Sequence, residues 1–139
     1  MKLRSHIIAS IIFSTLFFWV FKSWKITAVC LLSGVLIDID HVFDYFLEHK
    51  KRFRVKEFFD LHNNAKMLFF MVIFHSWELL ALLGICAFLM KWDPWVVGVT
   101  IGFTQHIILD QIFNKPNKWL YFFLWRLKND FSAIKFLSN

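Results

Sequence analysis

Four ionisable side chains occur within seven residues, directly after an apolar segment: Asp38, Asp40, His41 and Asp44. Asp38 and His41 form an i,i+3 pair. Asp40 and Asp44 form an i,i+4 pair, so on a helix all four side chains fall within one half of the circumference. Three carboxylates on one face repel one another unless a cation lies among them. Carboxylate and imidazole ligands suit zinc, manganese or magnesium-like ions, so the segment predicts a metal site.

The alternative for this segment is a helix end that reaches water, with its acids solvated. Ionisable groups near membrane depth are rare unless they pair, bind an ion or line a wet cavity. We favour the metal site because the charged residues interrupt the apolar segment instead of following it.

The chain has 139 residues, of which 58% are hydrophobic, and a mean hydropathy of +0.55. It contains 19 Phe and seven Trp. A soluble domain of this size leaves much of its surface exposed and could not bury so many large apolar side chains. Composition therefore predicts an all-α membrane protein, a polytopic helical bundle in which residues 1–139 form a single domain.

Four apolar stretches predict four transmembrane helices: Ile7–Phe21, Ile26–Phe46, Met67–Met90 and Trp95–Phe113. The first is read as an uncleaved helix, because Trp and Phe stand where a signal peptide needs small residues. Glu57–Lys66 is expected to be an interfacial turn or helix. The segment Trp119–Leu127 is too short to cross ~30 Å of hydrocarbon, so we expect an interfacial C-terminal helix.

The basic residues are distributed unevenly over the connections. Thirteen of the sixteen Lys and Arg fall in the N-terminus, the second connection or the C-terminal region, and three (Lys22, Lys25, Lys91) fall in the other two turns. The positive-inside rule then places both termini in the cytoplasm, with the protein integral to the cytoplasmic (inner) membrane. The basic loop Lys50–Lys56 is expected to face anionic lipid headgroups, and membrane lipids are favoured over nucleic acid as partners.

This topology brings further ionisable residues toward the same leaflet. His6 begins the first span, His75 and Glu78 lie one helical turn apart in the third, and His106 and Asp110 form an i,i+4 pair in the fourth. The candidate metal ligands are His6, Asp38, Asp40, His41, His75, His106 and Asp110, with Asp44 and Glu78 nearby. These exceed the needs of one tetrahedral ion, so two or more divalent ions, zinc first, are expected. His49 and His62 lie outside the spans and are not favoured as ligands.

The order of these motifs resembles a known family. His6, the Gly34-x-x-x-Asp38-x-Asp40-His41 segment, His75-Ser76 and His106-x-x-x-Asp110 are similar to the YdjM-like family of membrane-bound metal-dependent hydrolases. That family is distantly similar to zinc-dependent phospholipase C and P1-type nucleases. The resemblance covers most of the chain up to about Asp110. It implies a metal site made of His6, Asp38, Asp40, His75, His106 and Asp110. This chain has Ile37 where the family often has Pro, and it lacks the family's Arg-Gly before His75.

The sequence therefore predicts a membrane-bound, metal-dependent hydrolase of a phosphoester in a lipid or lipid-linked substrate at the cytoplasmic leaflet. Metal ions would activate water and stabilise charge on the phosphoryl oxygens. Glu78 or Asp44 would act as general base or would orient a ligand histidine. Two alternatives stay open: a metal-binding or transport protein, and a structural membrane adaptor whose polar residues join helices.

Overall fold

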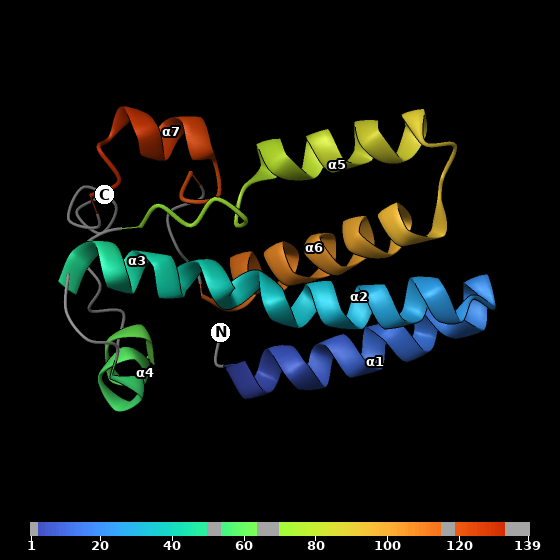
Figure 1. The fold of residues 1–139 in the computed structure, drawn as a ribbon, viewed down its shortest axis with the longest axis horizontal. Coiled ribbons are helices and arrows are strands. Elements are labelled where there is room, and N and C mark those ends of the chain that lie inside the picture. The colour runs from blue at the N-terminus through green and yellow to red at the C-terminus, as the bar shows by residue number, and fades with distance from the viewer. Residues whose placement is uncertain (1–2, 50–53, 64–69, 115–118, 133–139) are drawn as a thin grey trace.

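The computed structural model describes residues 3–49, 54–63, 70–114 and 119–132. The described residues form helices and connecting turns, with no strand among them. In Figure 1, α1, α2, α5 and α6 lie side by side, while α3, α4 and α7 gather at the end where the chain begins. The helices are α1 Leu3–Phe21, α2 Trp24–Leu36, the 3-10 turn η1 Ile37–Ile39, α3 Asp40–His49, α4 Val55–Asn63, α5 Trp77–Leu89, α6 Pro94–Phe113 and α7 Phe123–Lys128.

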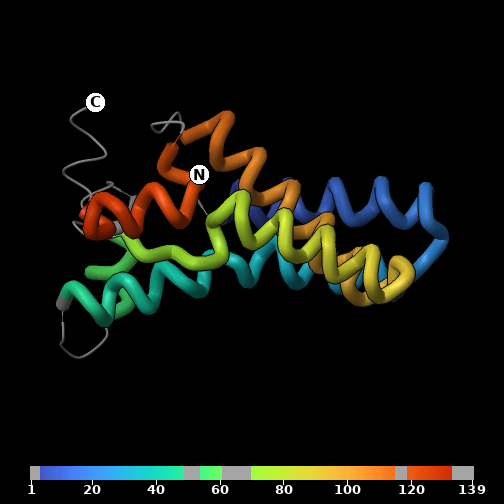
Figure 2. Tube along the Cα trace, turned by 90° about the horizontal axis from the view of Figure 1, so that it is seen from above, coloured from blue at the N-terminus to red at the C-terminus, as the bar shows by residue number. Residues whose placement is uncertain are grey.

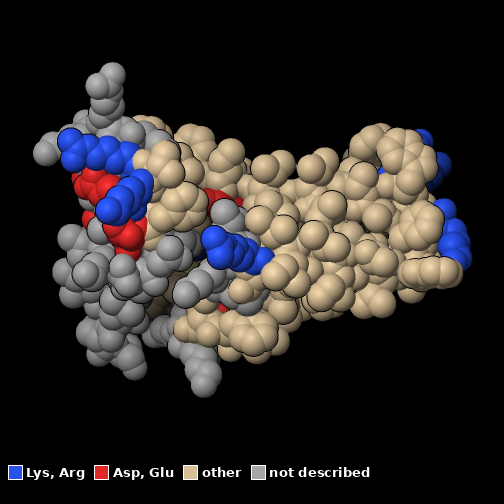
Figure 3. Space-filling view, turned by 90° about the horizontal axis from the view of Figure 1, so that it is seen from below, with Lys and Arg blue, Asp and Glu red and all other residues tan. Residues whose placement is uncertain are grey.

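Three helical stretches are long and apolar enough to cross a membrane: Arg4–Phe21, Trp24–Glu48 and Pro94–Phe113. Their outer faces carry exposed large side chains such as Ile8, Leu16 and Leu32. Figure 3 shows this as a continuous surface without charge, bounded on both sides by Lys and Arg. The predicted all-helical class is confirmed. The 13 residues of α5 rise only about 20 Å, so a count of four spans stays a prediction.

The second predicted span is one helical path with a tighter turn inside it. It begins at Trp24, where Ser23 caps the first turn by accepting a hydrogen bond from the Ile26 amide at 3.4 Å. The path changes to the 3-10 turn η1 at Ile37. Just before this turn, the Gly34 carbonyl lies 2.8 Å from Nδ1 of His106. A side chain that enters the backbone hydrogen-bond ladder in this way is a recognised cause of such local irregularity.

The prediction of a continuous helix over Met67–Met90 was wrong at its start. Within the described part, Phe70–Ser76 is turn and irregular backbone, and α5 begins only at Trp77. Ser76 caps α5, because its backbone is extended and its Oγ accepts from the Leu79 amide at 3.3 Å. His75 is therefore not one helical turn from Glu78 on a shared helix face. The physical reason is that carboxylates of α3 accept hydrogen bonds from backbone N–H groups of this segment.

Close packing of α2 against α6 depends on small residues. Gly98 and Gly102 are one turn apart on α6 and both are buried. A Cβ at Gly98 would lie 2.9 Å from the Ile26 carbonyl oxygen, and one at Gly102 would lie 2.6 Å from that of Cys30. Small residues at this spacing let membrane helices approach closely. The approach turns the buried face of α6, which carries His106 and Asp110, toward α2.

Within the described residues, the two predicted interfacial segments contain the short helices α4 and α7. α7 covers six residues, Phe123–Lys128, and Trp119–Tyr121 forms a turn before it. Figure 2 shows α7 beside the segment that leads into α5, and the Trp77 amide donates to the Tyr121 carbonyl at 2.9 Å. The short α4 occupies much of the expected interfacial stretch. Most of the basic loop Lys50–Lys56 lies outside the described residues.

Candidate metal site

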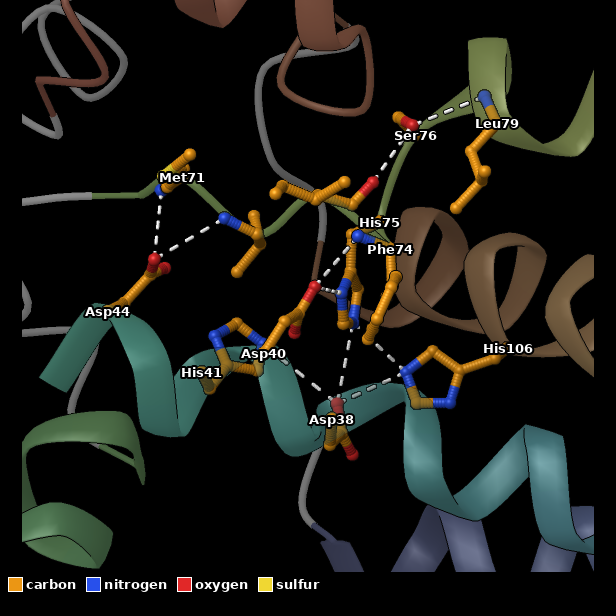
Figure 4. Close-up of polar contacts among 12 residues, drawn as sticks. Asp38, Asp40, His41, Asp44, Met71, Phe74, His75, Ser76, Leu79 and His106 are labelled. Atoms are coloured by element: carbon orange, nitrogen blue, oxygen red, sulfur yellow. Dashed lines mark hydrogen bonds and ion pairs between the residues drawn. The ribbon is translucent and has the colours of Figure 1, made fainter. Parts of the chain in front are cut away.

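Two carboxylates and two imidazoles from separate parts of the chain bring four ligand atoms together: Asp38, His75, His106 and Asp110. The Nε2 atoms of His75 and His106 are 3.2 Å apart. Asp38 Oδ1 lies 3.4 Å from His75 Nε2 and 3.2 Å from His106 Nε2 (Figure 4). Asp110 Oδ2 lies 3.6 Å and 3.5 Å from the same two nitrogens. These four atoms surround one point, and a metal ion could be held there.

The second nitrogen of each imidazole has its own oxygen partner. His106 Nδ1 lies 2.8 Å from the Gly34 carbonyl, which can only accept, so this nitrogen carries the proton. His75 Nδ1 lies 3.1 Å from Asp40 Oδ2 (Figure 4). With both protons on Nδ1, two Nε2 lone pairs and two carboxylate oxygens face one another. Such a set of acceptors repels itself unless a cation lies between its members.

Asp110 is held in place by residues outside the four-residue group. Its Oδ1 lies 3.0 Å from His6 Nε2 and accepts from Asn114 Nδ2 at 2.8 Å. The His6 ring also stacks on His106, with centroids 3.9 Å apart and planes at 11°. The structure thus places His6, a predicted ligand, beside the group, where it orients Asp110 and supports His106.

A second group of possible ligands consists of Asp40, His41 and His75. His41 Nε2 lies 3.9 Å from Asp38 Oδ1, and its ring lies 4.9 Å from that of His75. The two groups share His75, whose Nδ1 faces Asp40 and whose Nε2 faces the first group. All seven predicted ligands therefore gather at one place, within or directly beside these two groups.

Asp40 and Asp44, one turn apart on α3, hold the segment that carries His75. Asp40 Oδ2 accepts from the Phe74 amide at 2.9 Å as well as contacting His75. Asp44 Oδ1 accepts from the amides of Met71 and Val72 at 3.1 and 3.4 Å (Figure 4). These bonds replace the helical hydrogen bonds that a continuous third span would have made. They fix where the His75 ring enters the site.

Glu78 lies outside both groups and contacts α7. Its two carboxylate oxygens accept from the amides of Phe123 and Leu124 at 2.9 and 3.1 Å. Phe122, at the N-cap of α7, makes no side-chain capping bond, so Glu78 satisfies the first turn of this helix from a distance. Asp44, the other predicted base, is also engaged with backbone amides through Oδ1.

Sequence reasoning did not single out Arg126, which the structure buries completely. Burial lowers the pKa of its guanidinium to about 10, against the opposing influence of the Asp40, Asp44 and Glu78 carboxylates. It therefore stays protonated at neutral pH. The available signal was one Arg inside the aromatic stretch Trp119–Leu127. A cation there is equally typical of an interfacial helix that extends its charge to water.

No family model, curated protein or solved structure matches the chain. The resemblance to the YdjM-like family stays an expectation from motif order, and the candidate site is defined by its geometry.

Proposed function

We propose that the protein is a membrane-embedded, zinc-dependent hydrolase of phosphoesters at headgroup depth in the cytoplasmic leaflet. One observation carries the proposal: four ligand atoms of the right chemical types converge on a single point. Five of their six separations are known, and they fall between 3.2 and 3.6 Å. A tetrahedral zinc ion with ligands at about 2.0–2.1 Å requires ligand separations of about 3.3–3.4 Å. The residues present therefore fit zinc.

The partners of the ligands support the same proposal. Histidines that bind a metal commonly donate their other N–H to a carboxylate or a backbone carbonyl, which fixes the tautomer and raises the basicity of the ligand nitrogen. Asp40 would serve His75 in this way, and the Gly34 carbonyl would serve His106. In this assignment Asp40 orients His75 and is not itself a metal ligand. A single ion bound by the four-residue group then accounts for the observed distances.

In this proposal the group lies at headgroup depth, where a lipid headgroup could reach it. Three of its members are buried, whereas Asp38 is half-buried and connects the group with the surface. When bound, the ion supplies a Lewis acid for the phosphoryl group and makes water a better nucleophile near neutral pH. His75 and His106 would hold it as neutral donors, and Asp38 and Asp110 would balance its charge. The apolar surface of the long helices would keep the acyl chains in hydrocarbon.

We further propose four membrane crossings with both termini in the cytoplasm. α5 and the non-helical Phe70–Ser76 segment before it would together form the third crossing in chain order. Non-helical backbone is tolerated at membrane depth where protein groups satisfy it, and Asp40 and Asp44 do this for Phe74, Met71 and Val72. The thirteen-to-three distribution of basic residues supports the orientation. Reporter fusions at Asn139 and in the Lys91–Asp93 turn should lie on opposite sides, and the same side for both would reject this topology.

The activity test uses purified, zinc-loaded protein with phospholipid vesicles and, separately, a soluble phosphodiester. We expect lipid cleavage that stops with a chelator and in Asp38→Asn, because that variant lacks a ligand. Turnover of the soluble ester with lipids untouched would reject the lipid substrate.

A second candidate function, metal transport, is favoured by one observation. Buried polar residues continue from the site into the bundle, where Gln105 donates to Ser10 Oγ at 2.9 Å and Ser14 lies one turn beyond Ser10. These residues carry no charge, which is why hydrolysis is preferred. Zinc flux into proteoliposomes, together with no turnover by zinc-loaded protein, would favour transport.

A further inference from the structure

Arg126 is a buried cation that the proposed metal chemistry does not use. It lies in the last turn of α7, and its side chain is 0% exposed. Within the described part of the chain, none of its three side-chain nitrogens has a hydrogen-bond partner. One face of the guanidinium is near the Phe123 ring, with Cζ 5.8 Å from the ring centroid. The N–H donors of the guanidinium are therefore all available to bind a ligand.

A buried guanidinium without hydrogen bonds is strongly unfavourable, and proteins rarely retain one unless an anionic partner accepts its hydrogen bonds. The nearby protein anions do not complete it here. Asp40 and Asp44 exert their charge on Arg126, yet Oδ1 of Asp40 and Oδ2 of Asp44 are themselves buried without a hydrogen-bond partner. The guanidinium and these carboxylates therefore lie close enough to interact electrostatically, but no hydrogen bond joins them. The N–H donors of Arg126 stay available to an external anion.

The structure fixes Arg126 relative to the metal site through short connections. Glu78 holds the first turn of α7, and the Trp77 amide bonds to the Tyr121 carbonyl. Trp77 follows the segment that carries His75. Asp40 links the two places again, because it contacts His75 directly and also exerts its charge on Arg126. An anion bound by the guanidinium would therefore lie near Asp40, which contacts His75 of the four-residue group.

We propose that Arg126 is the anion-binding residue of the site and donates hydrogen bonds to phosphoryl oxygens of the ligand. The inference rests on the proposed function for the phosphoester identity of that ligand. The planar guanidinium can engage two phosphate oxygens at once, which an ammonium group cannot do with the same geometry. The residue would hold the phosphoryl group beside Asp38, His75, His106 and Asp110. The guanidinium is fully buried beside the Phe123 ring, which limits competition from water.

The test is calorimetric titration of the purified protein, zinc-loaded and chelator-treated, with inorganic phosphate and with a short-chain phosphatidic acid. Arg126→Met should lose binding of both probes, and Arg126→Lys should weaken it on the order of tenfold, as expected for one charge-assisted hydrogen bond. Lys128→Gln removes an exposed charge from the same turn and should bind as the wild type does. Binding of phosphatidic acid but not inorganic phosphate would assign the site to lipid headgroups, and equal binding would assign it to phosphate in general.

Thermal unfolding separates this role from a structural ion pair. Replacing an uncompensated buried charge with an apolar side chain of similar length should leave the melting temperature unchanged or raise it. Destabilisation of Arg126→Met that Asp44→Asn reverses, with wild-type phosphate affinity in Arg126→Lys, would overturn the proposal. If Arg126→Met does not fold, the phosphate affinity of Arg126→Lys alone tests the proposal. Absence of binding of either probe by the wild type would also overturn it. If Arg126 binds phosphate but the zinc-loaded protein hydrolyses no phosphoester, the proposed hydrolase function is rejected while the anion-binding role of Arg126 is supported.

Discussion

The two walls of the candidate site are built differently. One wall consists of α1, η1 and α6 and carries His6, Asp38, His106 and Asp110. The other consists of the Phe70–Ser76 segment, which carries His75 and lies beside α7 (Figure 2). The helical wall is positioned by close packing at Gly98 and Gly102. The second wall is positioned by carboxylates that accept backbone N–H groups. Changes to the helical wall should therefore act through packing, and changes to the second wall through single hydrogen bonds.

The largest effect is expected when a ligand is removed from the second wall. His75→Ala should lower zinc affinity by more than the roughly 10- to 100-fold typical of residues that only support a ligand. Membrane insertion and helix content should be unchanged, because the long helices pack without the His75 segment. Zinc analysis and circular dichroism of the detergent-purified protein check this. Full zinc occupancy in the variant would show that His75 is not a ligand.

Asp40→Asn should give the next largest effect. Asn keeps an acceptor for one of the two bonds but loses the charge that orients His75, so zinc affinity should fall by about 10- to 100-fold. A competition titration with a chelating dye measures this. Asp60→Asn, which changes an exposed carboxylate on α4, serves as the control and should bind zinc normally. Equal zinc affinities in the two variants would show that Asp40 does not support zinc binding.

Gly102→Ala tests the helical wall. The added methyl group would meet the Cys30 carbonyl, so α2 and α6 must separate. The expected loss is about 1–3 kcal/mol in the free energy of unfolding. Gly84→Ala is the matched control, because nothing lies within 4 Å of a Cβ at Gly84. Unfolding in a denaturing detergent compares the two. Equal stability would contradict the close approach of these helices.

The smallest effect is expected from Glu78→Gln. The change keeps an acceptor but removes the charge that caps α7, and the site is partly solvated, so about 0.5–1 kcal/mol of local stability should be lost. Hydrogen exchange should become faster in α7, while zinc occupancy is unchanged. Loss of zinc in this variant would instead give Glu78 a direct part in the site.

The helical wall is the part of the molecule that the sequence could predict. Apolar stretches of suitable length predicted the three helices that are long enough to cross a membrane, and the His106/Asp110 spacing placed both residues on one face of α6. Basic residues at the helix ends supplied an expected orientation that brought distant residues toward one leaflet. These inferences need only helical periodicity and the membrane as solvent. The close packing at Gly98 and Gly102 was not noticed, although its spacing is visible in the sequence.

The second wall could not be predicted in the same way. Met67–Met90 has the hydropathy of a helix, but in its described part the amides of Val72 and Phe74 donate to Asp44 and Asp40, about thirty residues earlier, instead of to helical carbonyls. The roles of Glu78 and Arg126 depend on where the short α7 packs. Its local sequence equally fits an interfacial helix. Such long-range contacts between side chains and backbone have no periodic signature in the chain.

The most direct test of the central claim is X-ray absorption spectroscopy of the zinc-loaded protein. We predict one zinc ion per chain with about four nitrogen or oxygen ligands at about 2.0–2.1 Å, and outer-shell scattering from two imidazoles. His106→Ala should remove one imidazole contribution. A six-coordinate ion without imidazole scattering, or a protein that retains no zinc after removal of excess metal, would contradict the four-residue site.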